Sequence, residues 1–313
     1  MIIKKNINYW AELFMVSKEL EMIIKFLRKN QILGVDIPVE QARQFLNKLT
    51  SMTKPHKDIN IEAFNIKSIS AEWISAPDAQ SDKIILYLHG GGYVTGSIDT
   101  HRAFISSLSQ KIKCHCLSID YRLAPENPFP AALDDAITAY RWLIEEKMIH
   151  PSNLIIAGES AGGGLTLSTI MKIKKIGLAL PSACMVFSPW ADLLNTGATL
   201  KTKKEEDPFL SPEVLFKFSK MYYANDDPKN PLISPLYGDF KDFPPLLIQV
   251  GTSEILLSDS TRVAERAKEA GVDVTIEQYN QMIHAFQLFE SFVPEGKEAM
   301  NKINNFVQKI FFE

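Results

Sequence analysis

The chain has 313 residues, of which 46% are hydrophobic and 23% charged, and a formal net charge of -3. This composition is typical of a soluble globular protein, and the length allows one large α/β domain with a decorating segment. The slightly acidic balance argues against nucleic acid as a partner, because a nucleic-acid-binding surface needs an excess of basic residues.

The sequence indicates neither a membrane span nor a secretion signal. No run approaches the roughly 18 apolar residues that cross a bilayer, so we expect no stable membrane insertion. Lys4 and Lys5 stand near the start of the chain, but no apolar signal core or small-residue cleavage site follows them. We therefore expect a cytoplasmic location.

Helical spacing of apolar residues predicts two helices near the N-terminus, over residues 10–27 and about 39–49. We interpret residues 1–50 as an N-terminal helical cap segment. One interpretation is that this segment packs on the main domain as a structural cap. The alternative is that it forms a lid over an active site. A helix lying on a membrane surface is a weaker alternative, because the polar face mixes glutamates with lysines.

Residues 59–76 read as short strands and predict an antiparallel hairpin at a sheet edge. Apolar runs then alternate with helical or loop segments, which predicts a mostly parallel sheet covered on both faces. The runs are 83–88, 114–119, 153–157, 183–187, 245–250 and 272–278. Residues 192–243 break this rhythm and predict a helical insertion between two strands. The last run is expected at a sheet edge, where it could pair across a homodimer.

Three cysteines, Cys114, Cys116 and Cys184, lie in apolar, strand-like runs. An odd and sparse set argues against a disulfide framework. The segment Cys-His-Cys at 114–116 alternates within a strand and has no second pair of ligands, which favours a buried core over a metal site. We expect neither a metal nor a cofactor.

A glycine-rich loop follows the apolar run at 84–88. It reads His89-Gly90-Gly91-Gly92-Tyr93, and consecutive glycines let the backbone approach a substrate and aim N–H groups into a cavity. Such donors stabilise the charge that develops on a carbonyl oxygen in a tetrahedral transition state. A plain glycine-rich turn is the alternative.

The segment at 158–162, Gly-Glu-Ser-Ala-Gly, lies between an apolar run and a small-residue helical pattern. This order of strand, tight turn and helix is typical of a nucleophile elbow, with Ser160 exposed at its tip. Glycine recurs on both sides because the sharp turn excludes bulk. A turn that merely caps a helix is the alternative.

A serine hydroxyl needs a base and a carboxylate to act as a nucleophile. His284, after the final strand, is the candidate base, whereas the other histidines lie in helical, strand or loop patterns and His89 fits a structural role in the glycine loop. Glu254, just past the carboxyl end of the run 246–250, is the favoured acid. Asp259 is the rival, and its alternative role is a charge at a helix N-terminus. The chain order Ser160, Glu254, His284 is that of the α/β-hydrolase motif.

Over residues 60–312 the sequence resembles the hormone-sensitive-lipase family of α/β-hydrolase esterases. The resemblance is carried by five motifs, namely His-Gly-Gly-Gly at 89–92, Asp-Tyr-Arg-Leu-Ala-Pro-Glu at 120–126 with Pro-Phe-Pro-Ala-Ala at 128–132, Gly-Glu-Ser-Ala-Gly-Gly at 158–163, Ser-Pro-Trp-Ala-Asp at 188–192 and Met-Ile-His-Ala-Phe at 282–286.

The resemblance implies an α/β-hydrolase fold with a mostly parallel eight-stranded sheet, flanking helices and a helical cap. Residues 51–313 would form the catalytic domain, with a cap insertion at about 192–240. It also implies oxyanion donors at Gly91, Gly92 and Ala161. The segment 121–126 is expected to buttress the floor of the active site.

Two positions depart from the family pattern. The family usually has Asp before the nucleophile, whereas this chain has Glu159, which we expect to hydrogen-bond locally with little effect on the chemistry. The family acid is also commonly Asp, so Glu254 places its carboxylate about one C–C bond further out.

The sequence thus predicts a serine carboxylic-ester hydrolase that works through a Ser-His-Glu triad and an acyl-enzyme. Tyr93 and the aromatic residues of the insertion suggest a crowded pocket that prefers short to medium acyl esters, with activity falling below about pH 6 as His284 takes up a proton. An amidase or deacetylase using the same triad is the alternative. A non-catalytic small-molecule receptor is disfavoured because His284 is present.

Overall fold

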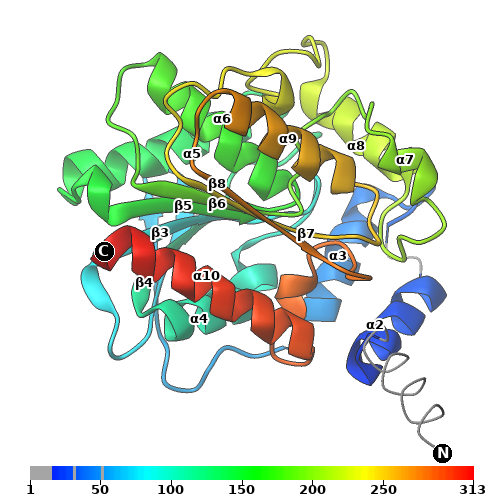
Figure 1. The fold of residues 1–313 in the computed structure, drawn as a ribbon, viewed down its shortest axis with the longest axis horizontal. Helices are drawn as coiled ribbons and strands as arrows, with labels where there is room; N and C mark the ends of the chain where they lie inside the picture. The colour runs from blue at the N-terminus through cyan, green and yellow to red at the C-terminus, as the bar shows by residue number, and fades with distance from the viewer. Residues whose placement is uncertain (1–15, 31–32, 51–52) are drawn as a thin grey trace, which may run out of the picture.

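The computed structural model describes residues 16–30, 33–50 and 53–313. An eight-stranded sheet lies in the middle of the molecule and is covered by helices on both faces (Figure 1). The strand order is β1-β2-β4-β3-β5-β6-β7-β8, in which β1, β2 and β4 are antiparallel neighbours and all other pairs are parallel. The predicted α/β-hydrolase architecture with a mostly parallel sheet is confirmed.

The strands follow the predicted hairpin and apolar runs closely. They are β1 Asn60–Ile66, β2 Ile69–Ser75, β3 Gln80–Leu88, β4 Cys114–Ile119, β5 Leu154–Glu159, β6 Ala183–Phe187, β7 Leu246–Gly251 and β8 Val274–Tyr279. The central strands are buried on both faces, which is why they read as continuous apolar runs. Consecutive residues of β3 show this, because Ile85 and Leu86 belong to different hydrophobic clusters on opposite faces of the sheet.

Helices α5, α6 and α9 cover one face of the sheet, and α4 and α10 cover the other (Figure 1). Their bounds are α4 Ile98–Ile112, α5 Ala131–Arg141, α6 Ala161–Lys175, α9 Leu257–Glu269 and α10 Pro294–Phe312. Short helical turns span Trp142–Glu146, Pro151–Asn153, Pro235–Tyr237 and Phe286–Phe289. The aliphatic core therefore lies in two layers, one on each side of the sheet.

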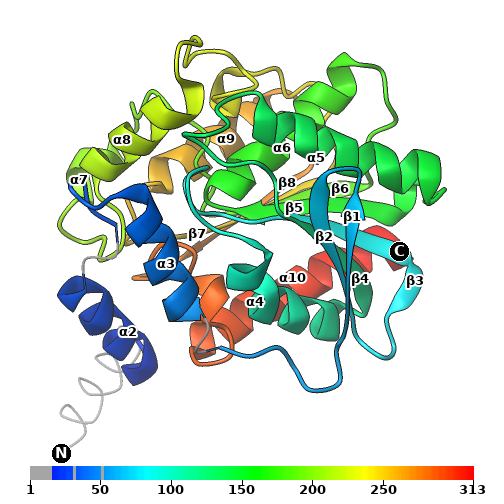
Figure 2. The same ribbon diagram turned by 180° about the vertical axis from the view of Figure 1, so that it is seen from behind.

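Four further helices, here called the cap helices, gather beside the C-terminal ends of the parallel strands (Figures 1 and 2). They are α2 Lys18–Lys29 and α3 Val39–Thr50 from the start of the chain, and α7 Thr199–Thr202 and α8 Pro212–Tyr223 from the segment between β6 and β7. The predicted first helix is described from Lys18 onward, and its residues 10–15 lie outside the described residues.

Specific contacts hold the cap helices in place. Arg28 on α2 donates to the carbonyl oxygens of Glu205 and Glu206, and Lys217 on α8 donates to those of Val35 and Ile37. The two cap segments, distant in sequence, are thereby joined to each other.

Strands β1 and β8 form the two edges of the sheet, as expected for the hairpin and the last run. Pairing of β8 across a homodimer stays a prediction. No helix in the described ranges combines the length and apolarity needed to cross a membrane. The three cysteine side chains are buried, as the strand pattern predicted.

Candidate active site

Ser160 lies at the turn between β5 and α6, in a backbone conformation that side-chain-bearing residues rarely adopt. Its φ is +54°. The flanking glycines are required by close backbone contacts, because a Cβ on either Gly158 or Gly162 would collide with the carbonyl oxygen of Leu88. Strand, turn and helix thus push the serine into a cavity, as the pentapeptide predicted.

The glycine loop follows β3 and lies next to this turn. Gly91 and Gly92 have φ values of +113° and +64°, in the region that favours glycine. Within the described residues, no acceptor takes a hydrogen bond from the backbone N–H of Gly91, Gly92 or Ala161. Gly91 and Gly92 also line the cavity that contains Ser160. Unpaired N–H groups beside a serine are the donors that an oxyanion hole requires, so these three groups stay the predicted oxyanion donors.

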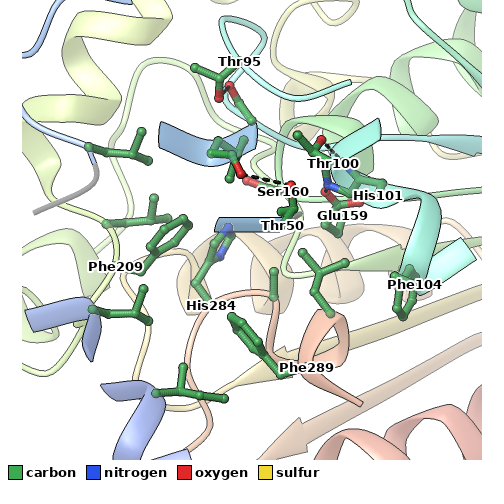
Figure 3. A pocket seen from close by; sticks show the side chains of 18 of the residues that line it. Thr50, Thr95, Thr100, His101, Phe104, Glu159, Ser160, Phe209, His284 and Phe289 are labelled. Carbon is green, nitrogen blue, oxygen red and sulfur yellow. Dashed lines mark hydrogen bonds and ion pairs between the residues drawn. The ribbon is translucent and has the colours of Figure 1, made fainter. Parts of the chain in front are cut away.

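His284 and Glu254 are brought together by the loops that follow β8 and β7. The His284 Nδ1 lies 3.1 Å from Glu254 Oε2, and both side chains are buried. Because a carboxylate accepts, Nδ1 must donate, which leaves Nε2 as the free acceptor. Figure 3 shows the His284 ring directed toward the region of Ser160, with Phe209 beside it.

The surroundings of His284 favour its protonated form. Burial by itself lowers the pKa of His284, but the hydrogen bond and charge of Glu254, followed by the charges of Asp207 and Glu159, raise it above its ordinary value. Burial also raises the pKa of Glu254, because the hydrogen bond and charge of His284 offset only part of that effect. The negative charges of these three carboxylates therefore favour a cation at His284.

Asp259, the rival acid, lies elsewhere. It is buried in the first turn of α9, where it accepts from the backbone N–H groups of Ala191 and Asp192 and pairs with Arg262. Burial, followed by the charge of Asp192, raises the pKa of Asp259 to about 7. The described residues show no hydrogen bond from it to His284, so the structure brings Glu254 and not Asp259 to the candidate base.

Glu159 has long-range partners, contrary to the local hydrogen bonding expected of it. Its carboxylate accepts from the Tyr87 hydroxyl at 2.5 Å, from His101 Nε2 at 2.7 Å and from the backbone N–H of Gly90. The charge of His101 holds the pKa of Glu159 below its usual value despite burial, which acts to raise it. This carboxylate therefore fixes the glycine loop from behind the nucleophile. Nothing in the sequence indicated that His101 contacts Glu159. The two residues meet only because α4 packs beside the end of β5.

His89 has the structural role predicted for it. Its ring stacks on Tyr121 with centroids 4.1 Å apart, and the Tyr121 hydroxyl donates to the His89 carbonyl oxygen at 2.6 Å. Burial, followed by the charge of His101, lowers the pKa of His89 to about 3. A neutral, buried imidazole of this kind supports the loop and does not serve as a base.

A cavity of about 450 Å³ joins Ser160 and His284 to the cap helices. This volume falls within the roughly 300–1,000 Å³ typical of small-molecule sites. Its walls are mostly apolar and come from both cap segments and the main domain, and they include Ile23, Leu27, Leu46, Phe104, Phe209, Leu210, Phe218, Leu288 and Phe289.

The expectation that Tyr93 crowds this cavity is wrong. Tyr93 is buried and stacks on Tyr222 with centroids 3.7 Å apart, so its ring is used in packing and is not among the cavity walls. The backbone of Tyr93 has a positive φ of +62°.

The fold and this arrangement define the class of protein. A strained serine, a buried histidine–carboxylate pair and free N–H donors at one edge of a mostly parallel sheet are the features of an α/β-hydrolase. Residues 85–288 match a family model described as an alpha/beta hydrolase fold.

The particular family follows from the relatives. The chain is 35% identical over 300 residues to an acetyl-hydrolase of Streptomyces hygroscopicus, covering 94% of this chain and 97% of that protein. It is 34% identical over 269 residues to an esterase of Acinetobacter venetianus, covering 86% and 88%.

A solved structure of an esterase from the bacterial hormone-sensitive-lipase family superposes with a TM-score of 0.92 and 39% identity, over 95% of this chain and 99% of the other. A structure of EstE5, soaked with p-nitrophenyl butyrate, has a TM-score of 0.91 and 39% identity, over 95% and 100%. The chain belongs to the hormone-sensitive-lipase family of α/β-hydrolases and is an enzyme of the esterase class.

Proposed function

We propose that this protein hydrolyses carboxylic esters through a triad of Ser160, His284 and Glu254. The observation that carries the proposal is the hydrogen bond between His284 and Glu254 beside a cavity that also contains Ser160. The names of the relatives, an acetyl-hydrolase and an esterase, support the same reaction.

The reaction proceeds in two steps. Ser160 attacks the ester carbonyl while His284 Nε2 takes the hydroxyl proton, and the protonated histidine then gives that proton to the leaving alcohol. His284 next activates water, which attacks the acyl-serine and releases the acid. Glu254 stays ionised and holds the tautomer of His284 in both steps.

The N–H groups of Gly91, Gly92 and Ala161 bind the oxyanion of each tetrahedral intermediate. These N–H groups are oriented and unpaired before the reaction starts. They therefore stabilise the oxyanion without the free-energy cost of reorienting donors during the reaction. Removing one such donor typically costs about 10²–10³ in rate.

The substrate class is an ester with a short to medium acyl chain. The described parts of both cap segments line the apolar cavity, and we propose that residues 1–50 and about 192–240 together act as the cap of the catalytic domain. An apolar wall without a fixed cationic side chain among the described lining residues suits an uncharged acyl chain.

Replacement of the nucleophile tests this function. Ser160→Ala is expected to lower the turnover of p-nitrophenyl butyrate by about 10⁴-fold or more. Ser168→Ala is the matched control, because Ser168 is buried two turns further along α6 and its hydroxyl has no partner among the described residues. Equal turnover by Ser160→Ala and the wild type would refute the mechanism.

An amidase or deacetylase with the same triad is the alternative function, because the oxyanion chemistry is shared. Paired esters and anilides of the same acid separate the two. A higher kcat/KM for the anilide would favour the amidase.

A further inference from the structure

A second buried carboxylate, that of Asp207, lies next to the candidate base. Asp207 belongs to the loop between α7 and α8, and only 7% of it is exposed. No part of the mechanism above uses Asp207, and nothing in the sequence singled out this residue within the predicted insertion.

Asp207 joins the cap to the loop that carries Glu254. One of its oxygens, Oδ1, accepts from the backbone N–H groups of Phe209 and Leu210, each at 2.9 Å. The other, Oδ2, accepts from the N–H of Ile255 at 2.9 Å, and Ile255 directly follows Glu254. A single side chain therefore sets the turn of the cap loop and the position of the acid.

The turn that Asp207 holds places Phe209 against the base. The rings of Phe209 and His284 are nearly parallel, with an angle of 18° and centroids 6.1 Å apart. Phe209 and Leu210 also line the cavity. The Asp207 turn thus places an apolar wall on one side of the imidazole.

The charges around His284 come from several elements. Glu254 follows β7, Asp207 lies on the cap loop, Glu159 ends β5, and Glu19 on α2 lines the same cavity. A neighbouring cleft, which Asp207 and Phe209 also line, holds the cations Arg28, Lys29 and Lys204 and the anion Glu205. Burial raises the pKa of Asp207, whereas the charge of His284 and the three backbone N–H donors act to lower it. The ionised Asp207 acts on His284 in the same direction as Glu254.

We propose that Asp207 is a positioning residue of the catalytic base, which holds Glu254 and Phe209 around His284 and stabilises the imidazolium by its negative charge. This inference rests on the proposed function, because it assigns Asp207 a role in the same triad. It predicts that the protonation of His284 depends on a cap residue that touches neither the substrate nor the nucleophile.

The sharpest variant is Asp207→Asn. An amide keeps one acceptor oxygen for the N–H groups of Phe209 and Leu210, but it directs an NH₂ group toward the N–H of Ile255. The change removes the negative charge and the hydrogen bond from the N–H of Ile255. It keeps the acceptor for the N–H groups of Phe209 and Leu210 in the cap loop. We expect kcat for p-nitrophenyl butyrate to fall by about tenfold, with KM changed by less than about threefold.

The second measurement is the titration of His284 in the free protein, followed by NMR with labelled histidine. The His284 signal is the one lost in His284→Gln. Without the charge of Asp207, we expect the pKa of His284 to fall by roughly half a unit to one unit. Asp207→Glu keeps the charge and is expected to keep that pKa even if it perturbs the turn.

Asp192→Asn is the matched control. Asp192 is a fully buried carboxylate of the same insertion, and it holds backbone and side-chain donors of its own loop and Arg262. A purely structural role for Asp207 would make both Asn variants less stable and leave the pKa of His284 unchanged in both, and that result would overturn the proposal. Asp207→Ser, whose hydroxyl can still accept from Leu210, replaces Asp207→Asn if the latter does not fold.

The two proposals fail differently. If Ser160→Ala keeps full turnover, the proposed function is wrong, while the NMR titration still reports whether Asp207 controls His284. If Ser160→Ala is inactive but Asp207→Asn has a normal pKa at His284 and a normal kcat, the proposed function stands and the role of Asp207 is refuted.

Discussion

Glu254 and Asp259 are both buried carboxylates at the start of the same segment, and their neighbours give them different roles. Glu254 lies in the loop directly after β7 and contacts His284, whereas Asp259 is one helical turn further on and points toward the β6–α7 loop. The loop position of Glu254 and the helical position of Asp259 therefore direct the two carboxylates to different partners.

Substitution of the two carboxylates separates their roles. Glu254→Gln is expected to lower kcat by about 10³–10⁴, because the amide no longer orients His284 or stabilises its cation. Asp259→Asn is expected to lower the free energy of unfolding by about 1–3 kcal/mol and to leave kcat within about threefold. Turnover of p-nitrophenyl butyrate measures kcat, and denaturant unfolding measures the free energy of unfolding, for both variants. A loss of turnover only in Asp259→Asn would show that the acid is Asp259.

The acid limb of activity reports the pKa of His284. The neutral imidazole is the active form, so kcat/KM falls as the pH drops below that pKa. The sequence alone placed this fall near pH 6, but the structure raises the pKa above the ordinary value of 6.5, because Glu254, Asp207 and Glu159 outweigh burial. We expect the midpoint of the limb above pH 6.5, and a midpoint below pH 6 would contradict the charge arrangement described here.

At the scale of elements, Arg43 ties the cap helix α3 to the main domain. Arg43 donates to the carbonyl oxygens of Val94 and Ala124 at 2.8 and 3.0 Å and forms a two-pronged ion pair with Glu126. Val94 follows the glycine loop. Ala124 and Glu126 belong to the segment 121–126, which the resemblance assigned to the floor of the site. The helix also contributes Leu46 and Thr50 to the cavity wall, so its attachment shapes the site.

Arg43→Met tests this attachment. Methionine keeps an apolar stem but removes the donors, so α3 should loosen and KM should rise by about three- to tenfold, with a smaller change in kcat. Gln44→Met is the matched control on the same helix, because the hydrogen bond of Gln44 reaches only Glu40 in the adjacent turn. A KM that stays constant in Arg43→Met would show that α3 does not shape the substrate site.

At the scale of the whole molecule, the cavity is enclosed by parts that are far apart in the chain. Helix α2, helix α3, the insertion between β6 and β7 and the turn after His284 each contribute walls (Figure 3). Its volume of about 450 Å³ limits what it can bury, and its apolar lining makes added methylenes favourable until the space is filled.

A panel of p-nitrophenyl esters of increasing acyl length tests this limit. We expect kcat/KM to be highest for butyrate or hexanoate and to fall by roughly tenfold or more for palmitate, because a long chain must leave the cavity or displace a cap helix. Ser160→Ala serves as the background control for each ester. A kcat/KM that is highest for palmitate would show that the cap opens to a longer groove.

The sequence by itself determined the features that depend on neighbours along the chain. The alternation of strands and helices, the tight turn at Ser160 and the glycine loop follow from local backbone requirements, and chain order placed His284 and Glu254 at the same edge of the sheet. Five motifs in the expected order also indicated the family, which the comparisons confirm.

Only the tertiary structure decided which groups meet across those elements. The partners of Glu159 lie on β3, on the glycine loop and on α4, the Asp207 carboxylate reaches from the cap to Ile255, and the Tyr93 ring turns into packing with Tyr222. The physical reason is that burial and hydrogen-bond direction depend on contacts between segments tens to hundreds of residues apart. Periodicity and motif spacing describe one segment at a time, so they cannot contain that information.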